Sequence, residues 1–168
     1  REYFYPSSII KRSDGTLFGM NYYTHYVDSH NATVFYNISN NDGESWELKR
    51  GNVYFADEIR KNGDAWSSFV MHRSMYEDEN GNLYALMYGR YKSDSGFYRV
   101  IIVKSADDGA NWSVYSTVAS GAPLDKEGNA LTTDGGVTGY VEPVLTRCAD
   151  GSMLCVMRIG SNKPLYQT

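Results

Sequence analysis

A carboxylate and a guanidinium, Glu142 and Arg158, lie sixteen positions apart near the end of the 168-residue chain. The Asp150-Gly151 dipeptide between them is typical of a tight hairpin turn, so the two residues would lie on adjacent strands and face the same cavity. There an ionised carboxylate can serve as a base toward a phenol, whose pKa is near 10, and a planar guanidinium can bind a carboxylate through two hydrogen bonds. The alternative interpretation is a structural salt bridge between the two strands.

Residues equivalent to this pair occur around two other Asx-Gly turns. The three turn glycines are Gly15, Gly81 and Gly151. The residues near the start of the first strand of each unit are Tyr5, His72 and Glu142. The residues seven positions after each turn glycine are Tyr22, Tyr88 and Arg158. We expect these side chains to point into one channel, where the tyrosines and the histidine are candidate substrate-binding residues.

A longer motif, Ser-x-Asp/Asn-x-Gly-x-Ser/Asn-Trp, occurs twice, each time directly after a β-rich run. Its defining residues are Ser39, Asn41, Gly43 and Trp46 in the first copy and Ser105, Asp107, Gly109 and Trp112 in the second. The Asp or Asn side chain can bond the backbone two residues on, the glycine supplies a positive φ, and the tryptophan folds back as an apolar plug. We expect these residues to be structural.

The spacing of the two kinds of turn indicates a repeat. Ser39 follows Gly15 by 24 positions, and Ser105 follows Gly81 by the same 24. Each unit then contains four antiparallel strands, which is typical of a β-propeller blade. We predict an all-β propeller with blade one over about 3–48, blade two over about 67–118 and an incomplete blade three over about 139–168. A third motif is expected near position 175, so the open strand edges would be completed by more chain or by a second copy in a homodimer.

Composition excludes some classes of function. A net charge of −4 and a pI near 5.3 argue against a nucleic-acid partner, which favours a basic surface. No apolar run approaches the ~20 residues of a membrane span. The two cysteines, Cys148 and Cys155, lack the spacing of a metal site, and we interpret them as free thiols rather than as a disulfide. No metal or organic cofactor is implied, and the 14% aromatic content suits a secreted, periplasmic or cell-surface β-protein.

The repeated motif, with Gly139-Tyr140-Val141-Glu142-Pro143 and the turn at Asp150-Gly151, resembles the sialidase (neuraminidase) superfamily, whose repeats are called Asp boxes or BNR repeats. The resemblance extends over essentially the whole chain. It implies about half of a six-bladed propeller, with the boxes at the periphery and away from the catalytic centre.

The resemblance also implies roles for individual residues. It makes Glu142 the base toward a nucleophilic tyrosine, Arg158 a ligand of the substrate carboxylate, and Asp28 the acid/base. The first of the family's three carboxylate-binding arginines corresponds to Phe4, and Arg73 is the further guanidinium able to reach the channel. The nucleophilic tyrosine and the third arginine would lie in blades outside this chain.

The sequence therefore predicts a sialidase-like glycoside hydrolase that acts on a terminal sugar of a glycan. Because one carboxylate-binding arginine is replaced, a sugar other than sialic acid becomes a plausible substrate. Two alternatives stay open. One is a non-catalytic carbohydrate-binding propeller whose tyrosines stack on sugars, and the other is a structural or interaction propeller whose channel is only packed core.

Overall fold

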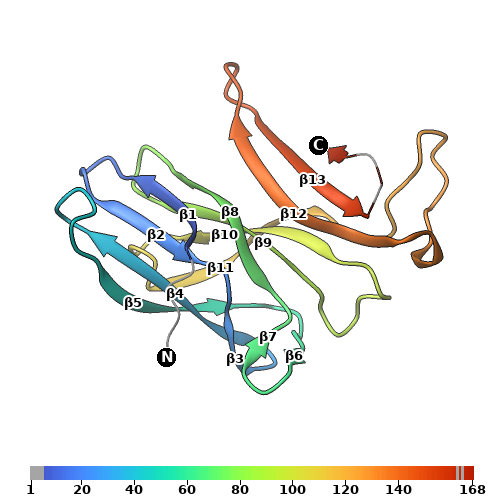
Figure 1. The fold of residues 1–168 in the computed structure, drawn as a ribbon, viewed down its shortest axis with the longest axis horizontal. Helices are drawn as coiled ribbons and strands as arrows, with labels where there is room; N and C mark the ends of the chain where they lie inside the picture. Colours follow the sequence, from blue (N-terminus) through green and yellow to red (C-terminus); the bar gives the residue numbers. More distant parts are fainter. Residues whose placement is uncertain (1–5, 162, 164) are drawn as a thin grey trace.

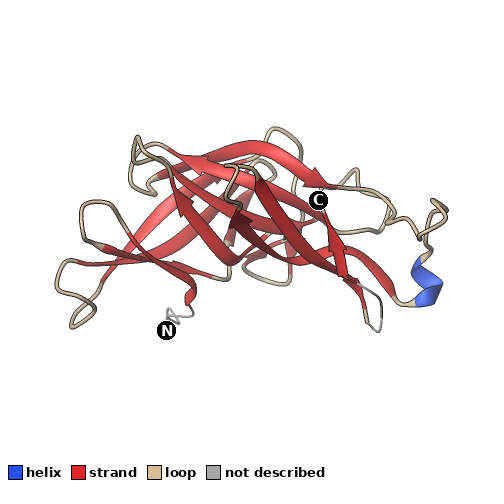
Figure 2. Ribbon diagram, turned by 90° about the horizontal axis from the view of Figure 1, so that it is seen from above, coloured by secondary structure: helices blue, strands red, loops and turns tan. Residues whose placement is uncertain are grey.

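The computed structural model describes residues 6–161, 163 and 165–168, and it is all-β apart from one short 3-10 helix (Figures 1 and 2). The elements are β1 (Pro6–Lys11), β2 (Leu17–Asn21), β3 (His25–Asp28), β4 (Asn31–Ser39), β5 (Glu47–Tyr54), β6 (Lys61–Asn62), β7 (Trp66–Ser67), β8 (Val70–Glu77), β9 (Leu83–Gly89), β10 (Arg99–Ser105), β11 (Asn111–Ala119), η1 (Thr133–Gly135), β12 (Val137–Arg147), β13 (Met153–Gly160) and β14 (Leu165–Gln167). The all-β prediction is confirmed.

Two four-stranded antiparallel meanders and one three-stranded sheet follow one another along the chain. The first meander is β1-β2-β4-β5, the second is β8-β9-β10-β11, and the third sheet is β12-β13-β14. The register repeats, because Leu17 pairs with Ser39 in the first meander and Leu83 pairs with Ser105 in the second. That these sheets are blades of a closed propeller stays a prediction.

The sheets depart from the expected boundaries at two places. Strand β5 continues to Tyr54, six residues beyond the expected end of blade one, because pairing with β4 persists as far as Asn31. The short hairpin β6–β7 lies between the meanders and pairs through Trp66 with β3, so the first meander carries strands beyond the four expected of a blade. The second meander runs from Val70 to Ala119, over the stretch where blade two was expected at about 67–118.

The two motif copies, hereafter the first box (39–46) and the second box (105–112), form the same turn. Ser39 Oγ accepts a hydrogen bond from Gly43 N at 2.9 Å, and Ser105 Oγ accepts one from Gly109 N at 3.0 Å. The carboxamide of Asn41 and the carboxylate of Asp107 each accept a bond from the backbone N–H four residues on. The tryptophan indole donates to the glycine carbonyl in both boxes. Side chains thus satisfy the backbone of each turn locally.

The second box is the part of the second meander that packs on the first. Asn52 N donates to Ala110 O at 2.9 Å, and β11 pairs in parallel with β5 from Asn111 to Ser113. A Cβ on Gly51 would lie far inside van der Waals contact with the carbonyl oxygen of Gly109. Two backbones therefore meet here without an intervening side chain, and Trp112 is only 2% exposed.

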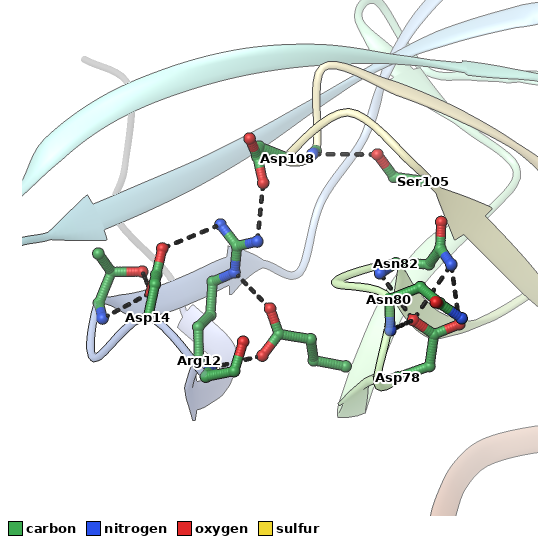
Figure 3. A network of polar contacts seen from close by, with 11 residues as sticks. Arg12, Asp14, Asp78, Asn80, Asn82, Ser105 and Asp108 are labelled. Carbon is green, nitrogen blue, oxygen red and sulfur yellow. Dashed lines mark hydrogen bonds and ion pairs between the residues drawn. The ribbon is translucent and has the colours of Figure 1, made fainter.

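Arg12 joins the same two meanders through ion pairs (Figure 3). Its Nε donates to Glu77 Oε1 at 2.9 Å, and its Nη2 lies 2.7 Å from Asp108 Oδ1 in the second box. Glu77 also accepts a bond from Ser13 N at 2.7 Å. Because the Arg12 side chain is only 10% exposed, salt screens these pairs less than it would screen exposed ones.

Two apolar cores lie between the sheets. The first packs the two meanders together and includes Phe18, Tyr36, Leu83, Ile101 and Trp112. The second lies between the second meander and the third sheet and includes Leu86, Val100, Tyr140, Cys155 and Met157. Cys148 and Cys155 are both free, as interpreted from the sequence, and burial raises the pKa of Cys155 to about 11.

We expect Gly51→Ala to lower the free energy of unfolding by about 3 kcal/mol or more, because the new methyl group overlaps backbone that cannot move without separating the meanders. The control is Gly19→Ala in β2, where an added Cβ meets Ile9 and Trp46 at ordinary contact distances of 3.5 and 3.6 Å. Urea unfolding measures both variants. Equal stability of the two would show that the meanders tolerate separation at this point.

Candidate functional site

The structure brings Glu142 of β12 and Arg158 of β13 together, as their spacing predicted. Arg158 Nε donates to Glu142 Oε2 at 2.8 Å, and Arg158 Nη2 donates to Glu142 Oε1 at 3.0 Å. This is a bidentate pair with geometrically matched partners. The Glu142 side chain is 43% exposed and the Arg158 side chain is 37% exposed, so a ligand has access to both.

Glu142 lies at a β-bulge. The pairing of β12 with β13 shifts register between Val141 and Val144, and Glu142 has a φ of +51°. Strand β8 shifts register between Met71 and Met75, and Arg73 there has a φ of +40°. Bulges next to active sites aim side chains, and a positive φ at a non-glycine residue persists only when its surroundings hold it.

The second meander holds the Glu142 bulge from both sides. His72 Nδ1 lies 3.1 Å from the carbonyl oxygen of Pro143, and Leu145 N donates to Ser74 Oγ at 2.9 Å. Upstream, Tyr140 N donates to Tyr98 O. Because a carbonyl only accepts, Nδ1 of His72 carries the proton in this contact, which leaves Nε2 of a neutral ring as an acceptor.

A group of aromatic side chains lies near the pair, close enough for the charge of Glu142 to act on Tyr22, Tyr88 and His72. The hydroxyls of Tyr22 and Tyr88 are hydrogen-bonded to each other. The His72 ring packs edge-on against both, with centroids 5.9 Å from Tyr22 and 5.5 Å from Tyr88, and Tyr98 lies 5.9 Å from Tyr88. Together with Glu142 and Arg158 on the third sheet, these residues come from both meanders.

The protonation states follow from burial and charge. Hydrogen bonds from Arg158 lower the pKa of Glu142, and His72 and Arg73 lower it further, so this carboxylate is ionised at neutral pH. Burial raises the pKa of both Tyr22 and Tyr88, so the phenols stay protonated. Burial lowers the pKa of His72, which favours the neutral ring. The cluster thus offers one base and several hydrogen-bond donors.

The other candidate residues are distributed unevenly. Arg73 lies next to His72 on β8, is exposed, and contributes positive charge at Glu142. Tyr5 and Phe4 lie outside the described residues. Asp28 ends β3, where it accepts hydrogen bonds from His30 N at 2.8 Å and from Asn31 Nδ2 at 3.0 Å.

The hydrogen bonds of Asp28 are made within its own turn. Its hydrogen bonds are those of an Asx turn that closes its own hairpin. The catalytic role implied for Asp28 stays a hypothesis.

Sequence reasoning did not single out two aromatic residues that lie at or beside the cluster. Tyr98 precedes β10, and its backbone forms a bridge to Gly139, where an added Cβ would collide with Tyr98. Trp66 contacts Tyr23 at a centroid distance of 4.8 Å. The available signal for Trp66 was a large aromatic residue in the stretch between the expected blades one and two.

Neither a metal site nor a membrane helix emerges from residues 6–161, 163 and 165–168. Within them, no group of histidine, cysteine, aspartate or glutamate side chains is placed to hold a metal ion. The same part of the chain includes no helix long and apolar enough to cross a membrane.

Comparison with known proteins bears on the fold. No protein-family model matches the chain, and no curated protein matches it. An endo-arabinase from Bacteroides thetaiotaomicron superposes with a TM-score of 0.55 at 12% identity, over 95% of this chain and 52% of that one. An endo-1,4-beta-xylanase from the same organism superposes with a TM-score of 0.52 at 17% identity, over 95% of this chain and 51% of that one. A protein of unknown function from Dyadobacter fermentans superposes with a TM-score of 0.58 at 16% identity, over 96% of this chain and 46% of that one.

The chain thus spans about half the length of the solved structures it matches. At these identities the likeness concerns the fold alone. The fold is one that glycoside hydrolases use.

We expect Arg158→Gln to raise the pKa of Glu142 toward the usual value for glutamate, about 4.3, because the hydrogen bonds that favour its ionised form are lost. Arg158→Lys, which keeps the charge without the fork, should raise the pKa less. Carboxyl ¹³C NMR, with the resonance assigned by Glu142→Gln, measures the titration. An unchanged pKa in Arg158→Gln would show that the ion pair does not form in solution.

The direction of the associated pH dependence is fixed by the lowered pKa. The stabilisation from the Glu142–Arg158 pair is fully present above the pKa of the unfolded chain and is lost as pH falls through the lower pKa of the folded state.

Proposed function

We propose that this chain provides part of the substrate site of a sialidase-like glycoside hydrolase, with the sugar bound at the Glu142–Arg158 pair. The observation that carries the proposal is the bidentate pair on a bulged residue, with His72, Tyr22 and Tyr88 close enough for the charge of Glu142 to act on them. The names of two fold neighbours, an endo-arabinase and an endo-1,4-beta-xylanase, support a glycosidase.

Arg158 retains the capacity to bind substrate. A guanidinium has five N–H donors, and Glu142 takes two of them. The free edge can bind a carboxylate or a pair of hydroxyl oxygens of the sugar. Arg73, exposed on the neighbouring strand, adds positive charge on the same side. An acidic sugar is favoured by this charge, and a neutral sugar is compatible with it.

Glu142 acts as the base in this proposal. Its pKa is lowered, so it is ionised and able to accept a proton at neutral pH, and it is correspondingly unsuited to donate one. The phenols of Tyr22 and Tyr88 have raised pKa values, so their role is to donate hydrogen bonds to sugar hydroxyls rather than to act as nucleophiles. The nucleophilic tyrosine of the sialidase pattern is then a different residue.

A non-catalytic glycan-binding function is the second candidate, and a specific observation favours it. Both oxygens of Glu142 are already hydrogen-bonded to Arg158, which lowers the basicity of the carboxylate. A site of this kind would bind a sugar through aromatic faces, phenols and a guanidinium without a reaction.

We expect Glu142→Gln to reduce turnover of a glycan substrate by roughly 10²-fold or more, because an amide cannot serve as a base. The natural protein is purified and tested on 3′-sialyllactose, xylo-oligosaccharides and arabino-oligosaccharides, with products separated by chromatography. Asp28→Asn is the matched control, because an amide oxygen can still accept the turn bond from His30 N.

Full turnover in Glu142→Gln would remove this residue from the mechanism. Turnover lost in Asp28→Asn would instead assign the proton donor to Asp28. Glycan binding without product in the unaltered protein would establish the second candidate function.

A further inference from the structure

Two aromatic rings beside the candidate site are exposed to solvent. Tyr23 is 46% exposed and Trp66 is 39% exposed. Their ring centroids lie 4.8 Å apart, with the planes inclined at 42°. Large aromatic side chains carry much of the binding energy of protein interfaces, and adjacent exposed rings form an apolar surface that a ligand can cover.

A dedicated hairpin holds Trp66 in this position. Strand β7 carries Trp66, and Ser67 N donates to Thr24 O at 2.9 Å while Tyr26 N donates to Ala65 O at 2.8 Å. The buried hydroxyls of Thr24 and Ser67 are 2.6 Å apart. This hairpin is an addition to the repeat, because in the described residues the pairing of the second meander includes no equivalent.

Other rings fix the orientation of Trp66 from behind. The His25 ring packs against the Trp66 ring at 4.6 Å and 73°, and His25 in turn packs against Phe35 at 4.7 Å and 69°. Phe35 is 7% exposed, so this stack is rooted in the core. A ring that is already oriented loses little conformational freedom when a ligand binds to it.

The exposed pair is continuous with the Glu142 cluster. Tyr23 packs edge-on against Tyr22 at 4.9 Å, and the Tyr22 hydroxyl is bonded to that of Tyr88. Tyr23 therefore contacts the cluster directly, through Tyr22. The aromatic contacts therefore run without a break from Trp66 through Tyr23 and Tyr22 to Tyr88.

We propose that Tyr23 and Trp66 form a second sugar-binding subsite, which stacks on an uncharged sugar ring adjacent to the one bound at the Glu142–Arg158 pair. The inference rests on the proposed function. The C–H groups on one face of a sugar ring carry partial positive charge, which suits the negative face of an aromatic ring, while the hydroxyls remain in water. The ligand is then an oligosaccharide of at least two units.

Calorimetric titration of the natural protein tests the subsite. The probes are xylose, arabinose and sialic acid, each compared with longer forms: xylobiose and xylotriose, arabinobiose and arabinotriose, and 3′-sialyllactose. We expect Trp66→Ala and Tyr23→Ala each to weaken binding of the longer forms by up to roughly tenfold, the scale of a lost aromatic contact, and to leave single sugars unchanged. Tyr115→Ala, which removes a ring that is 62% exposed on β11, should change neither.

A spectroscopic readout separates stacking from a structural role of Trp66. Trp66→Phe keeps a ring and should bind the longer sugars within about threefold of the unaltered protein. It should also lose the ligand-induced change in tryptophan fluorescence, because Trp46 and Trp112 lie in the box turns. Thermal unfolding checks that the variants fold, and Tyr23→Ala, outside the hairpin, tests the subsite if Trp66→Ala does not fold.

The outcomes distinguish this inference from the proposed function. Unchanged affinity for longer sugars in both alanine variants, or an equal loss for single and longer sugars, would overturn the subsite and leave the Glu142 proposal standing. A protein that binds none of the probes would overturn both.

Discussion

The contact between the backbones of Gly51 and Gly109 determines how the two meanders sit against each other. No side chain separates the strands at this point, and Asn52 N bonds directly to Ala110 O. A backbone contact of this kind has one geometry, whereas a contact between side chains can repack. Arg12 adds a second attachment at β8 and the second box. With the meanders fixed at these points, Tyr22 after β2 and Tyr88 on β9 arrive within hydrogen-bonding distance.

The two boxes show which part of a motif is local and which depends on the rest of the fold. Their internal hydrogen bonds match almost atom for atom, because each bond joins residues no more than four positions apart. The burial differs, however, since Trp112 packs inside the first core while Trp46 is only half-buried. The turn is thus encoded by its own residues, and its packing depends on the sheet opposite.

The same distinction explains how much could be predicted from the sequence. Turns and strand order follow from local rules, and the residues around Gly15 and Gly81 were sufficient to place most strands of both meanders. The hairpin β6–β7 was missed because strands of two residues have no periodicity to detect. The end of β5 was missed because the consecutive charged residues Lys49 and Arg50 show no strand-like alternation. Only their pairing with β4 marks them as part of a strand.

The candidate site was predictable only in part for a related reason. Glu142 and Arg158 share one hairpin and His72 holds an equivalent place in the repeat, so their spacing was informative, whereas Tyr98, which contacts Tyr88 from outside the repeat positions, gave no such signal. For Asp28, the family resemblance implied an acid/base role, and the structure adds three hydrogen bonds to its carboxylate from within its own turn. An Asp side chain next to a turn can bond the backbone of that turn. Its position in the sequence cannot show whether it also contacts a ligand.

The position of Glu142 joins stability and function in one residue. A positive φ at a glutamate costs on the order of 1–3 kcal/mol and is maintained only by surrounding contacts. Those contacts come from the second meander, through His72 at Pro143 and Ser74 at Leu145. The orientation of the Glu142 carboxylate therefore depends on the interface between the second meander and the third sheet. Any substitution that shifts this interface alters the site even when it leaves every ligand-facing side chain in place.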